Sequence, residues 1–299
     1  MDVSIILPSY NGAETLPRTL AALDRVVAPP GGMEIILVEN NSADDTARLM
    51  HGFAEGRVVQ VLSEPRQGKS HALNTALDAA QGALIVFTDD DTLADPDWVM
   101  AYVRAAEAHP DISVFAGQIR PDFSKPAAAW LSQLADAGRS FGCTALGRPD
   151  GPYEPLWVKG ANFAVRASAL ATARFDVAAL NFGASGQTAG GEDTEFVRSI
   201  VGTDPGRVRF VGEACVRHIV RADEMTLGSI FARYVRIGEG QVNMQTAERA
   251  YTRIGVAASI LRSAALVAAY ALTFQRQRAI SQIVTLAAQT GRIKALMRR

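Results

Sequence analysis

Three adjacent carboxylates, Asp89, Asp90 and Asp91, directly follow the apolar run Leu84–Thr88. At the end of a strand such groups repel one another unless a cation or solvent compensates their charge. In an extended chain Asp89 and Asp91 point to the same side, and their hard oxygen atoms suit Mg²⁺ or Mn²⁺. An ion held there would neutralise charge on a departing diphosphate. The alternative is an acidic turn before a helix that Asp95 caps.

Two further groups combine glycine with charged residues at expected helix starts. Gly68 and Lys69 suit a phosphate site, although the glycine spacing of a Walker A loop is absent; a plain loop-to-helix transition is the alternative. Gly190 and Gly191 precede Glu192 and Asp193. These two acids either cap the helix that follows, or one of them is a general base that takes a proton from an acceptor hydroxyl.

An alternation of short apolar strands and helical patterns positions these residues. Strands are expected at residues 3–7, 34–38, 58–62 and 84–88, and helices at 16–23, 44–53, 70–80 and 95–108. Such alternation indicates a parallel sheet covered on both faces. Ligands of such sheets bind at the carboxyl ends of the strands, so Pro8–Asn11, Glu39–Ser42 and Asp89–Asp91 should share one edge.

The rhythm changes after Ile119. Helices are expected at 127–137, 192–200 and 225–237, strands near 166 and at 207–211 and 214–219, and a glycine-rich loop at 181–191. The charge of -1, the hydrophobic fraction of 48% and the two cysteines describe an ordinary folded protein of a reducing compartment, with no pull toward nucleic acid. The N-terminus has no secretory signal pattern, so a cytoplasmic location is expected.

The motifs together resemble a known family. They run in order from Ile5–Asn11, through Val38–Ser42 with Asp45 and Thr46, Gly68–Asn74 and Phe87–Asp91, to Gly191–Asp193. Each motif alone is weak, but the ordered set, which spans about two hundred residues, resembles glycosyltransferase family 2.

The resemblance implies an α/β fold of the GT-A (Rossmann-like) type, a mostly parallel sheet flanked by helices, with a C-terminal helical extension. Residues 1–245 would form the catalytic domain, with a nucleotide-binding half at 1–115 and an acceptor half at 116–245; residues 246–299 would be a basic amphipathic tail. The implied activity moves one sugar from a nucleotide-diphospho-sugar, most commonly a UDP-sugar, to a hydroxyl acceptor. The family uses Mn²⁺ or Mg²⁺ and inverts the anomeric centre.

The resemblance also implies residue roles. The nucleotide would be contacted by Pro8, Tyr10, Asn11, Glu39, Asn41, Lys69, Asp89 and Asp90. The metal would be held by Asp91, Asp89 and His218, and the base would be Asp193, with Glu192 next. Trp157, Gly160 and Asn162 would line the pocket for the acceptor and the donor sugar.

Some of these assignments have open alternatives. Trp157 is either a pocket residue or a core aromatic, and His218 is either a metal ligand or structural. Glu39 and Asn40 stand where many members have two aspartates. The Gln-x-x-Arg-Trp run of processive members is absent at Arg233–Ile237, which favours transfer of one sugar per binding event.

The last part of the chain is basic. From Thr252 onward there is no Asp or Glu, and the basic residues are Arg253, Arg262, Arg276, Arg278, Arg292, Lys294, Arg298 and Arg299. Arg262 interrupts the apolar stretch Val256–Thr273 and argues against a membrane-spanning helix. Two helices with apolar stripes are expected instead. They either pack on the catalytic domain or on a second subunit, or they dock on the inner face of an anionic membrane beside a lipid-linked acceptor.

Two other functions remain open. A sugar-1-phosphate nucleotidyltransferase needs a glycine-rich, basic loop after the first strand, which Pro8–Gly12 does not supply. A non-catalytic nucleotide-sugar-binding protein would lack the base or a metal ligand, whereas Asp91 and Asp193 are both present.

Overall fold

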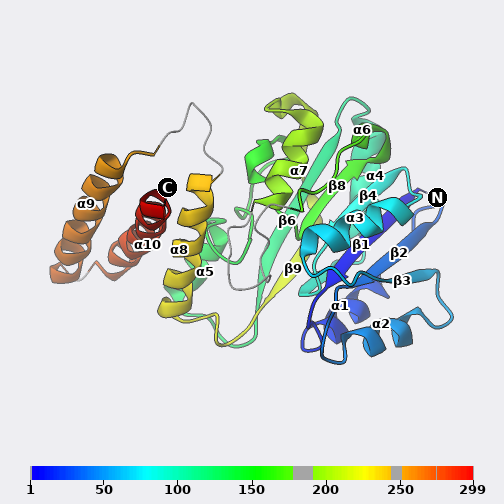
Figure 1. The fold of residues 1–299 in the computed structure, drawn as a ribbon, viewed down its shortest axis with the longest axis horizontal. Coiled ribbons are helices and arrows are strands. Elements are labelled where there is room, and N and C mark those ends of the chain that lie inside the picture. The colour runs from blue at the N-terminus through cyan, green and yellow to red at the C-terminus, as the bar shows by residue number, and fades with distance from the viewer. Residues whose placement is uncertain (1, 178–190, 244–250, 274, 299) are drawn as a thin grey trace. The chain divides into compact units, whose positions relative to one another are not determined.

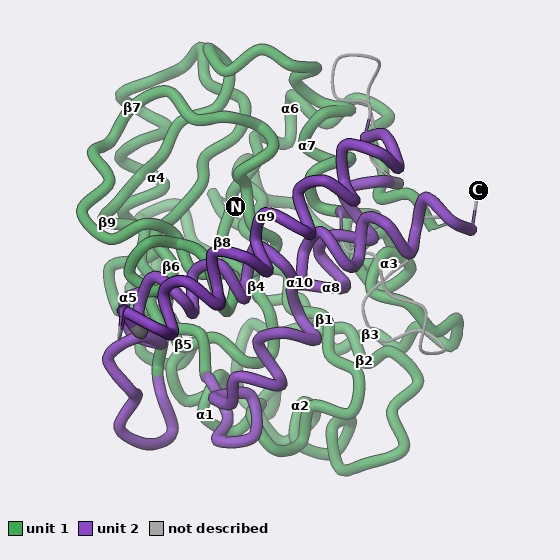
Figure 2. Tube along the Cα trace, turned by 90° about the vertical axis from the view of Figure 1, so that its left-hand side faces the viewer, with its two compact units in different colours: residues 1–122, 134–178, 192–219 green, residues 123–133, 179–191, 220–299 purple. Residues whose placement is uncertain are grey.

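The computed structural model describes residues 2–177, 191–243, 251–273 and 275–298. The chain forms two compact units, shown in green and purple in Figure 2. Unit 1 comprises residues 1–122, 134–178 and 192–219, and unit 2 comprises residues 123–133, 179–191 and 220–299. Every described residue that the sequence assigns to the site lies in unit 1.

The first part of the chain alternates strands and helices (Figure 1). The elements are β1 (Val3–Ser9), α1 (Leu16–Leu23), β2 (Met33–Glu39), α2 (Thr46–Ala54), β3 (Val59–Ser63), α3 (Lys69–Ala79), β4 (Leu84–Thr88), β5 (Thr92–Ala94) and α4 (Trp98–Ala108). The next are β6 (Val114–Phe123), α5 (Ala129–Asp136), β7 (Gly151–Pro152), the 3₁₀ helix η1 (Pro155–Trp157), β8 (Asn162–Arg166) and α6 (Ala167–Leu170). The last are α7 (Glu192–Val201), the 3₁₀ helix η2 (Pro205–Arg207), β9 (Val208–Val220), α8 (Leu227–Asn243), α9 (Arg253–Leu272) and α10 (Arg276–Arg298).

Within the described residues, the strands form one mixed sheet in the order β3-β2-β1-β4-β8-β6-β9-β5, with β7 beside β9. The half made by β3, β2, β1 and β4 is parallel, as expected from the alternation. The pairs β4–β8, β6–β8 and β5–β9 are antiparallel. The expected fold class, a GT-A-like sheet flanked by helices with helices at the C-terminus, is confirmed.

Two apolar layers cover the two faces of this sheet. One layer packs α1, α2 and α4 against it, with the buried rings of Trp98 and Tyr102. The other packs α3 and α7 against it, where the rings of Phe87 and Phe163 stack with their centroids 4.4 Å apart. The strands of the parallel half are apolar on both sides for this reason.

Three elements differ from the sequence expectation. The short strand β5 occupies part of the turn expected before α4, and α4 begins at Trp98 after Asp97, so Asp95 is not its cap. Strand β6 was not predicted from the sequence, because Gly117 and Pro121 interrupt its apolar run. The two strands expected at 207–211 and 214–219 are the single strand β9, which continues through Gly212.

Unit 2 contains α8, α9 and α10. A side chain at Gly238 of α8 would collide with the backbone of Ala288, and one at Gly291 of α10 with the backbone of Val235, so glycine allows these two helices to approach closely. Among the described residues, α9 is the one helix that is long and apolar enough to cross a membrane, judged by length and composition. In its most apolar 18-residue stretch, 11% is buried. The prediction that Arg262 opposes a span stays a prediction.

Candidate active site at the carboxyl edge of the sheet

Two loops that follow β1 and β2 are hydrogen-bonded to each other. The backbone N–H of Asn11 donates to the Ser42 hydroxyl at 3.1 Å, and Asn11 Oδ1 accepts from the N–H of Ala43 at 2.8 Å. Asn11 and Asn41 have φ of 50° and 59°, a region that asparagine enters more readily than most residues. Both exposed asparagines therefore shape one paired loop at the edge where the sequence predicts the nucleotide.

Three other residues predicted to contact the nucleotide lie beside these loops. Pro8 is buried in β1, whereas the Tyr10 side chain is 41% exposed. Glu39, at the end of β2, accepts hydrogen bonds from the backbone N–H of Ser42 and from the Ser63 hydroxyl. Tyr10 is therefore the most open of the three, and the protein itself fixes the carboxylate of Glu39.

Asn40 links the end of β2 to the loop before Lys69, a role that the sequence reading missed. Its amide nitrogen donates to the carbonyls of Glu64 and Arg66 at 2.9 and 2.8 Å, and its Oδ1 accepts from the N–H of Gly68 at 2.8 Å. Asn40 is buried, so these bonds are shielded from water. An ionised aspartate at this position could not donate to the two carbonyls.

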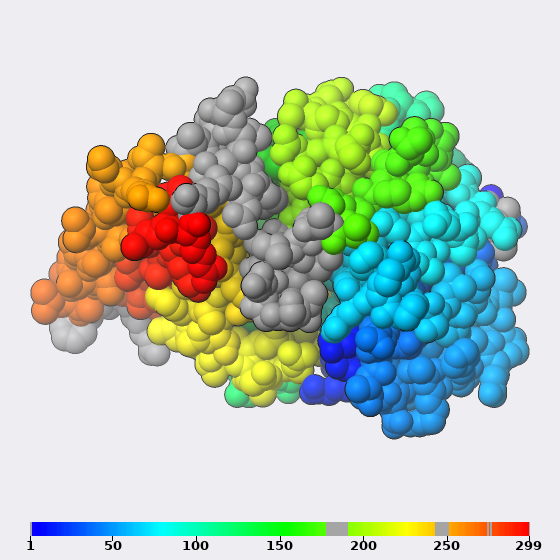
Figure 3. All heavy atoms as spheres, in the orientation of Figure 1, coloured from blue at the N-terminus to red at the C-terminus, as the bar shows by residue number. Residues whose placement is uncertain are grey.

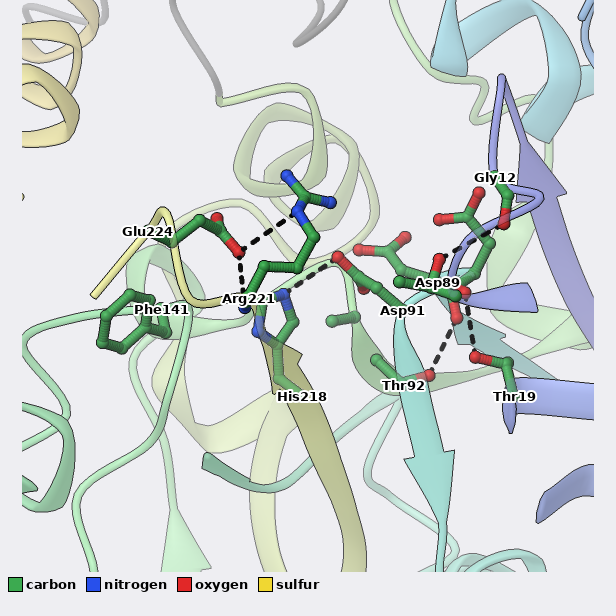
Figure 4. Close-up of polar contacts among 12 residues, drawn as sticks. Gly12, Thr19, Asp89, Asp91, Thr92, Phe141, His218, Arg221 and Glu224 are labelled. Carbon is green, nitrogen blue, oxygen red and sulfur yellow. Dashed lines mark hydrogen bonds and ion pairs between the residues drawn. The ribbon is translucent and has the colours of Figure 1, made fainter. Parts of the chain in front are cut away.

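The acidic triplet forms a turn rather than an extended segment. The Thr92 hydroxyl donates to the carbonyl of Asp89 at 2.8 Å, and the Thr19 hydroxyl donates to the carbonyl of Asp90 at 2.8 Å (Figure 4). The turn gives the three carboxylates different partners. The Asp90 carboxylate accepts from the Ser9 hydroxyl through Oδ2, and its predicted contact with the nucleotide stays a prediction.

Lys69, at the start of α3, lies among carboxylates. Its Nζ is 2.6 Å from Asp89 Oδ1. Burial by itself lowers the pKa of Lys69, but the charges of Asp89 and Asp193 outweigh it, with a contribution from Glu192, and hold that pKa well above its usual range. The predicted phosphate-binding lysine is therefore a permanent cation beside the predicted base.

Asp91 faces His218 at the end of β9. The two residues come together because β5 pairs with β9, which sets Thr92 opposite His218. Asp91 Oδ2 lies 3.2 Å from His218 Nε2, as Figure 4 shows. Both side chains are partly buried, with 29% and 12% exposed. Two of the three predicted metal ligands are thus side by side.

The third predicted ligand, Asp89, does not join them. Among the described residues no three His, Cys, Asp or Glu side chains form a group that could hold a metal ion, and Asp89 pairs with Lys69 instead. The physical reason is the turn at the triplet, which the extended-chain argument did not include. The remaining donors, a carboxylate and an imidazole, fit Mn²⁺ or Mg²⁺ held partly by substrate phosphates, because such ions commonly take only one or two protein carboxylates.

Asp193 and Glu192 begin α7, as predicted, after Gly191; Gly190 lies outside the described residues. Burial, followed by the Glu192 carboxylate, raises the pKa of Asp193 to about 7. The backbone of Gly160 hydrogen-bonds to Asp193, and any side chain at position 160 would collide with that carboxylate. Gly160 therefore contacts the predicted base, and only glycine leaves space for that carboxylate.

Trp157 packs beside a second aromatic ring and a cation. Its ring centroid is 5.6 Å from that of Tyr153, and the guanidinium of Arg148 lies 4.9 Å from its ring. Trp157 belongs to η1, which packs against α7, the helix that begins with Glu192 and Asp193, and its side chain is 46% exposed. Its role as a pocket residue stays a prediction.

The prediction that Asn162 lines a pocket requires a correction, because its side chain is buried in the core. Its Oδ1 accepts from Trp98 Nε1 and from the Tyr102 hydroxyl, both at 2.7 Å. Its amide nitrogen donates to the carbonyls of Gln118 and Ala214 at 2.9 and 2.8 Å. All four hydrogen-bonding positions of the side chain are used within the core, so none is left for a sugar.

Comparison with known proteins identifies the family. The undecaprenyl-phosphate 4-deoxy-4-formamido-L-arabinose transferase of Klebsiella pneumoniae strain 342 is 30% identical over 148 residues, which cover 47% of this chain and 45% of that protein. Glycosyltransferase AglE of Haloferax volcanii is 30% identical over 99 residues, 32% of this chain and 33% of that protein. The match thus covers less than half the length of either relative.

Two solved structures share the fold. The mannosyltransferase PcManGT from Pyrobaculum calidifontis, in complex with GDP-Man and Mn²⁺, has a TM-score of 0.67 at 19% identity, over 99% of this chain and 87% of that one. Residues 1–349 of S. aureus TarS, in complex with UDP, have a TM-score of 0.54 at 15% identity, over 96% of this chain and 90% of that one. At such identities the likeness establishes the fold alone.

The family model named glycosyl transferase family 2 matches residues 4–171, more than half of the 299-residue chain. The matched region contains the loops after β1 and β2, Lys69 and the acidic turn, which meet at one edge of the sheet in unit 1. The chain therefore belongs to glycosyl transferase family 2.

Proposed function

We propose that this protein transfers one sugar from a UDP-sugar to a hydroxyl acceptor by a single displacement that inverts the anomeric centre. The observation that carries the proposal is the cluster around Lys69, a partly buried cation that pairs with Asp89 and interacts with the charges of the acids that begin α7. A cation that holds a phosphate beside a carboxylate that can take a proton is what such a displacement requires.

The donor end of the site consists of Asp91, His218 and Lys69. Asp91 and His218 would hold a Mn²⁺ or Mg²⁺ ion together with the diphosphate; bound there, the ion supplies neutralisation of the charge that builds on the leaving diphosphate. Lys69 adds a second positive charge from the other side of the acidic turn. Two solved structures of the same fold, one in complex with GDP-Man and Mn²⁺ and one with UDP, support a nucleoside diphosphate donor and a divalent ion.

The acceptor end consists of Asp193, with Glu192 beside it. A carboxylate with a pKa near 7 takes a proton efficiently at neutral pH. As the acceptor oxygen forms a bond to the anomeric carbon, its proton passes to Asp193, and the bond from that carbon to the diphosphate oxygen breaks. The nucleoside diphosphate leaves with the electron pair of that bond.

The acceptor is proposed to be lipid-linked and to be met at the cytoplasmic face of a membrane. The transferase from Klebsiella pneumoniae acts, by its name, on undecaprenyl phosphate, a lipid phosphate, and so supports the lipid linkage of the acceptor. The hydroxyl group of the acceptor follows instead from the proposed base, Asp193. Transfer to a lipid-linked acceptor at that face also agrees with a nucleotide-sugar donor, which is made in the cytoplasm.

Release of UDP from UDP-sugars in the presence of Mn²⁺ and lipid-linked acceptors tests the proposal, alongside thermal unfolding with UDP. The variant Asp91→Asn should lose most UDP release and most of the Mn²⁺-dependent rise in melting temperature, because one of the two donors is neutralised. Asp111→Asn, at an exposed position, is the matched control and should keep both. If wild-type protein binds UDP and Mn²⁺ but releases no UDP with any acceptor, the protein is a binding protein and the proposal fails.

A further inference from the structure

Helix α9 exposes an apolar face along its whole length. The exposed fractions of Ile254, Leu261 and Leu272 are 85%, 73% and 81%. These residues are seven and eleven positions apart, so at about 100° per residue they fall within about 20° of one line on the helix. The exposed residues beside that line are all alanine, at positions 257, 258, 264, 265, 268 and 269. We name these nine residues the α9 stripe.

The opposite side of α9 is the side that packs inside unit 2. Val256 and Ser263 are buried, and Val256 lies in a small core with Val242 of α8 and Leu296 of α10. The Ser259 hydroxyl accepts a hydrogen bond from Gln289 of α10 at 2.8 Å. The helix is therefore already anchored by one side, and the α9 stripe contributes nothing to that anchoring.

Two cations of α10 bond to the neighbouring helix α8. Arg292 bonds to Gln241 Oε1 with distances of 2.6 and 3.0 Å, and Lys294 Nζ lies 2.8 Å from Glu239 Oε1. Both bonds join α10 to α8. Arg262, next to Leu261 on α9, is exposed instead, at the border of the α9 stripe. Arg262 is thus placed to meet an anion beside the apolar surface.

Charge selects the occupant of the α9 stripe. Neither α9 nor the rest of the chain after Thr252 contains an acidic residue, so a second copy of this region would bring like charges together. An anionic lipid surface instead offers apolar chains beneath negative headgroups. We propose that α9 lies along an anionic bilayer, with the α9 stripe in contact with the acyl chains and Arg262 at the headgroups.

Docking of α9 on anionic lipid would bring the enzyme to the lipid-linked acceptor of its proposed function, and in this respect the inference rests on that function. Binding to vesicles is measured without turnover, so the two can fail separately. An enzyme that releases UDP with a soluble acceptor but ignores vesicles would disprove only the docking of α9. An inactive protein that binds vesicles through α9 would disprove only the proposed function.

Sedimentation of the full chain with vesicles of phosphatidylglycerol or of phosphatidylcholine tests the proposal. The wild type should bind the anionic vesicles more tightly, and raising the salt from about 0.1 to about 1 M should weaken binding, because the Debye length falls from about 10 to about 3 Å. Leu261→Glu should lose affinity at least about tenfold, since it removes a leucine that the acyl chains would cover and adds repulsion from the anionic headgroups. Arg262→Gln should weaken binding to the anionic vesicles only.

The matched control is Val58→Glu, a change from an apolar to an acidic residue at a position 70% exposed in unit 1, which should leave vesicle binding unchanged. Equal binding to both vesicle types, or full binding by Leu261→Glu, would overturn the proposal. Light scattering provides a third check: a wild-type dimer that Leu261→Glu converts to monomer would assign the α9 stripe to a second copy. A monomer in both cases agrees with docking on lipid.

Discussion

The sheet edge in unit 1 and helix α9 in unit 2 depart from the usual distribution of side chains in opposite ways. The edge buries charged groups, among them Glu192 at 4% exposed, and surrounds Lys69 with carboxylates. Helix α9 leaves large apolar side chains in solvent; its atoms, orange in Figure 3, lie at the surface. Folding alone favours neither arrangement. Both agree with the two proposals, a charged donor at the sheet edge and a lipid surface at the α9 stripe.

The largest expected effect separates chemistry from docking. Asp193→Asn should lower the kcat for UDP release by about 10²- to 10⁴-fold, the usual contribution of a general base, while UDP still raises the melting temperature. Leu261→Glu should leave kcat with a short, soluble acceptor unchanged. Steady-state kinetics of both variants measure the contrast. A loss of kcat in Leu261→Glu with the soluble acceptor would erase the distinction between the two regions.

The second effect measures how far the buried charges depend on each other. Lys69→Met leaves Asp89 without its partner, and breaking a largely buried pair typically costs about 3 kcal/mol or more. Chemical denaturation should show that loss in the free energy of unfolding. Lys125→Met, at an exposed position, is the control and should change it by less than about 0.5 kcal/mol. Equal stability of the two variants would mean that the charges at the edge are already solvated.

The third effect is a pH dependence confined to the sheet edge. Because the pKa of Asp193 is raised to about 7, the base is protonated and inactive below that pH. The value of kcat/KM should rise about tenfold per pH unit toward pH 7 and then level off. The raised pKa also favours the protonated folded protein, so the stability from this group is lost as pH rises through about 7.

Asp193→Asn should remove the trend in the pH profile of the residual rate. It should reduce the trend in the melting temperature without abolishing it, because burial also raises the pKa of Asp90 to about 7. Vesicle binding by α9 should follow neither trend, because no titrating acid lies on that helix. A wild-type rate that stays flat from about pH 5 to about pH 8 would remove Asp193 as the base.

The smallest effect is expected at the α9 stripe in the absence of lipid. Since Leu261 is 73% exposed, Leu261→Glu should change the free energy of unfolding by less than about 0.5 kcal/mol. Val256→Ala, on the buried side of the same helix, should cost about 1 kcal/mol or more through a cavity. Thermal unfolding of the two variants measures the difference. Equal costs would show that the α9 stripe is packed against protein in solution.

The parallel half of the sheet could be predicted from sequence because each of its strands is short, apolar and followed by a helical pattern. The same pattern predicted that Pro8–Asn11, Glu39–Ser42 and Asp89–Asp91 share one edge, since ligands of parallel sheets bind at the carboxyl ends of the strands. The antiparallel half could not be predicted in this way. Its strands β6 and β9 contain Gly117 and Gly212, and they find their partners far along the chain.

The sequence pattern also did not predict that the carboxylates of Asp89, Asp90 and Asp91 have different partners. An extended chain sends Asp89 and Asp91 to one side, but the hydrogen bonds of Thr92 and Thr19 turn the backbone there. Likewise the basic tail reads as two equivalent helices. In the structure, Arg292 and Lys294 of α10 bond to Gln241 and Glu239 of α8. These bonds depend on the register of α8 against α10, which no local sequence pattern specifies.

The side-chain amide of Asn162 is hydrogen-bonded to three elements, α4, β6 and β9. A methyl group at position 117 would collide with this amide, so only glycine fits there. A joint of this kind resists sliding, because displacing any one of the three elements breaks a water-free bond. The strands behind the acidic turn should accordingly behave as a stiff frame. Whatever rearranges to admit the donor and to let its product leave must then come from the loops in front of that frame.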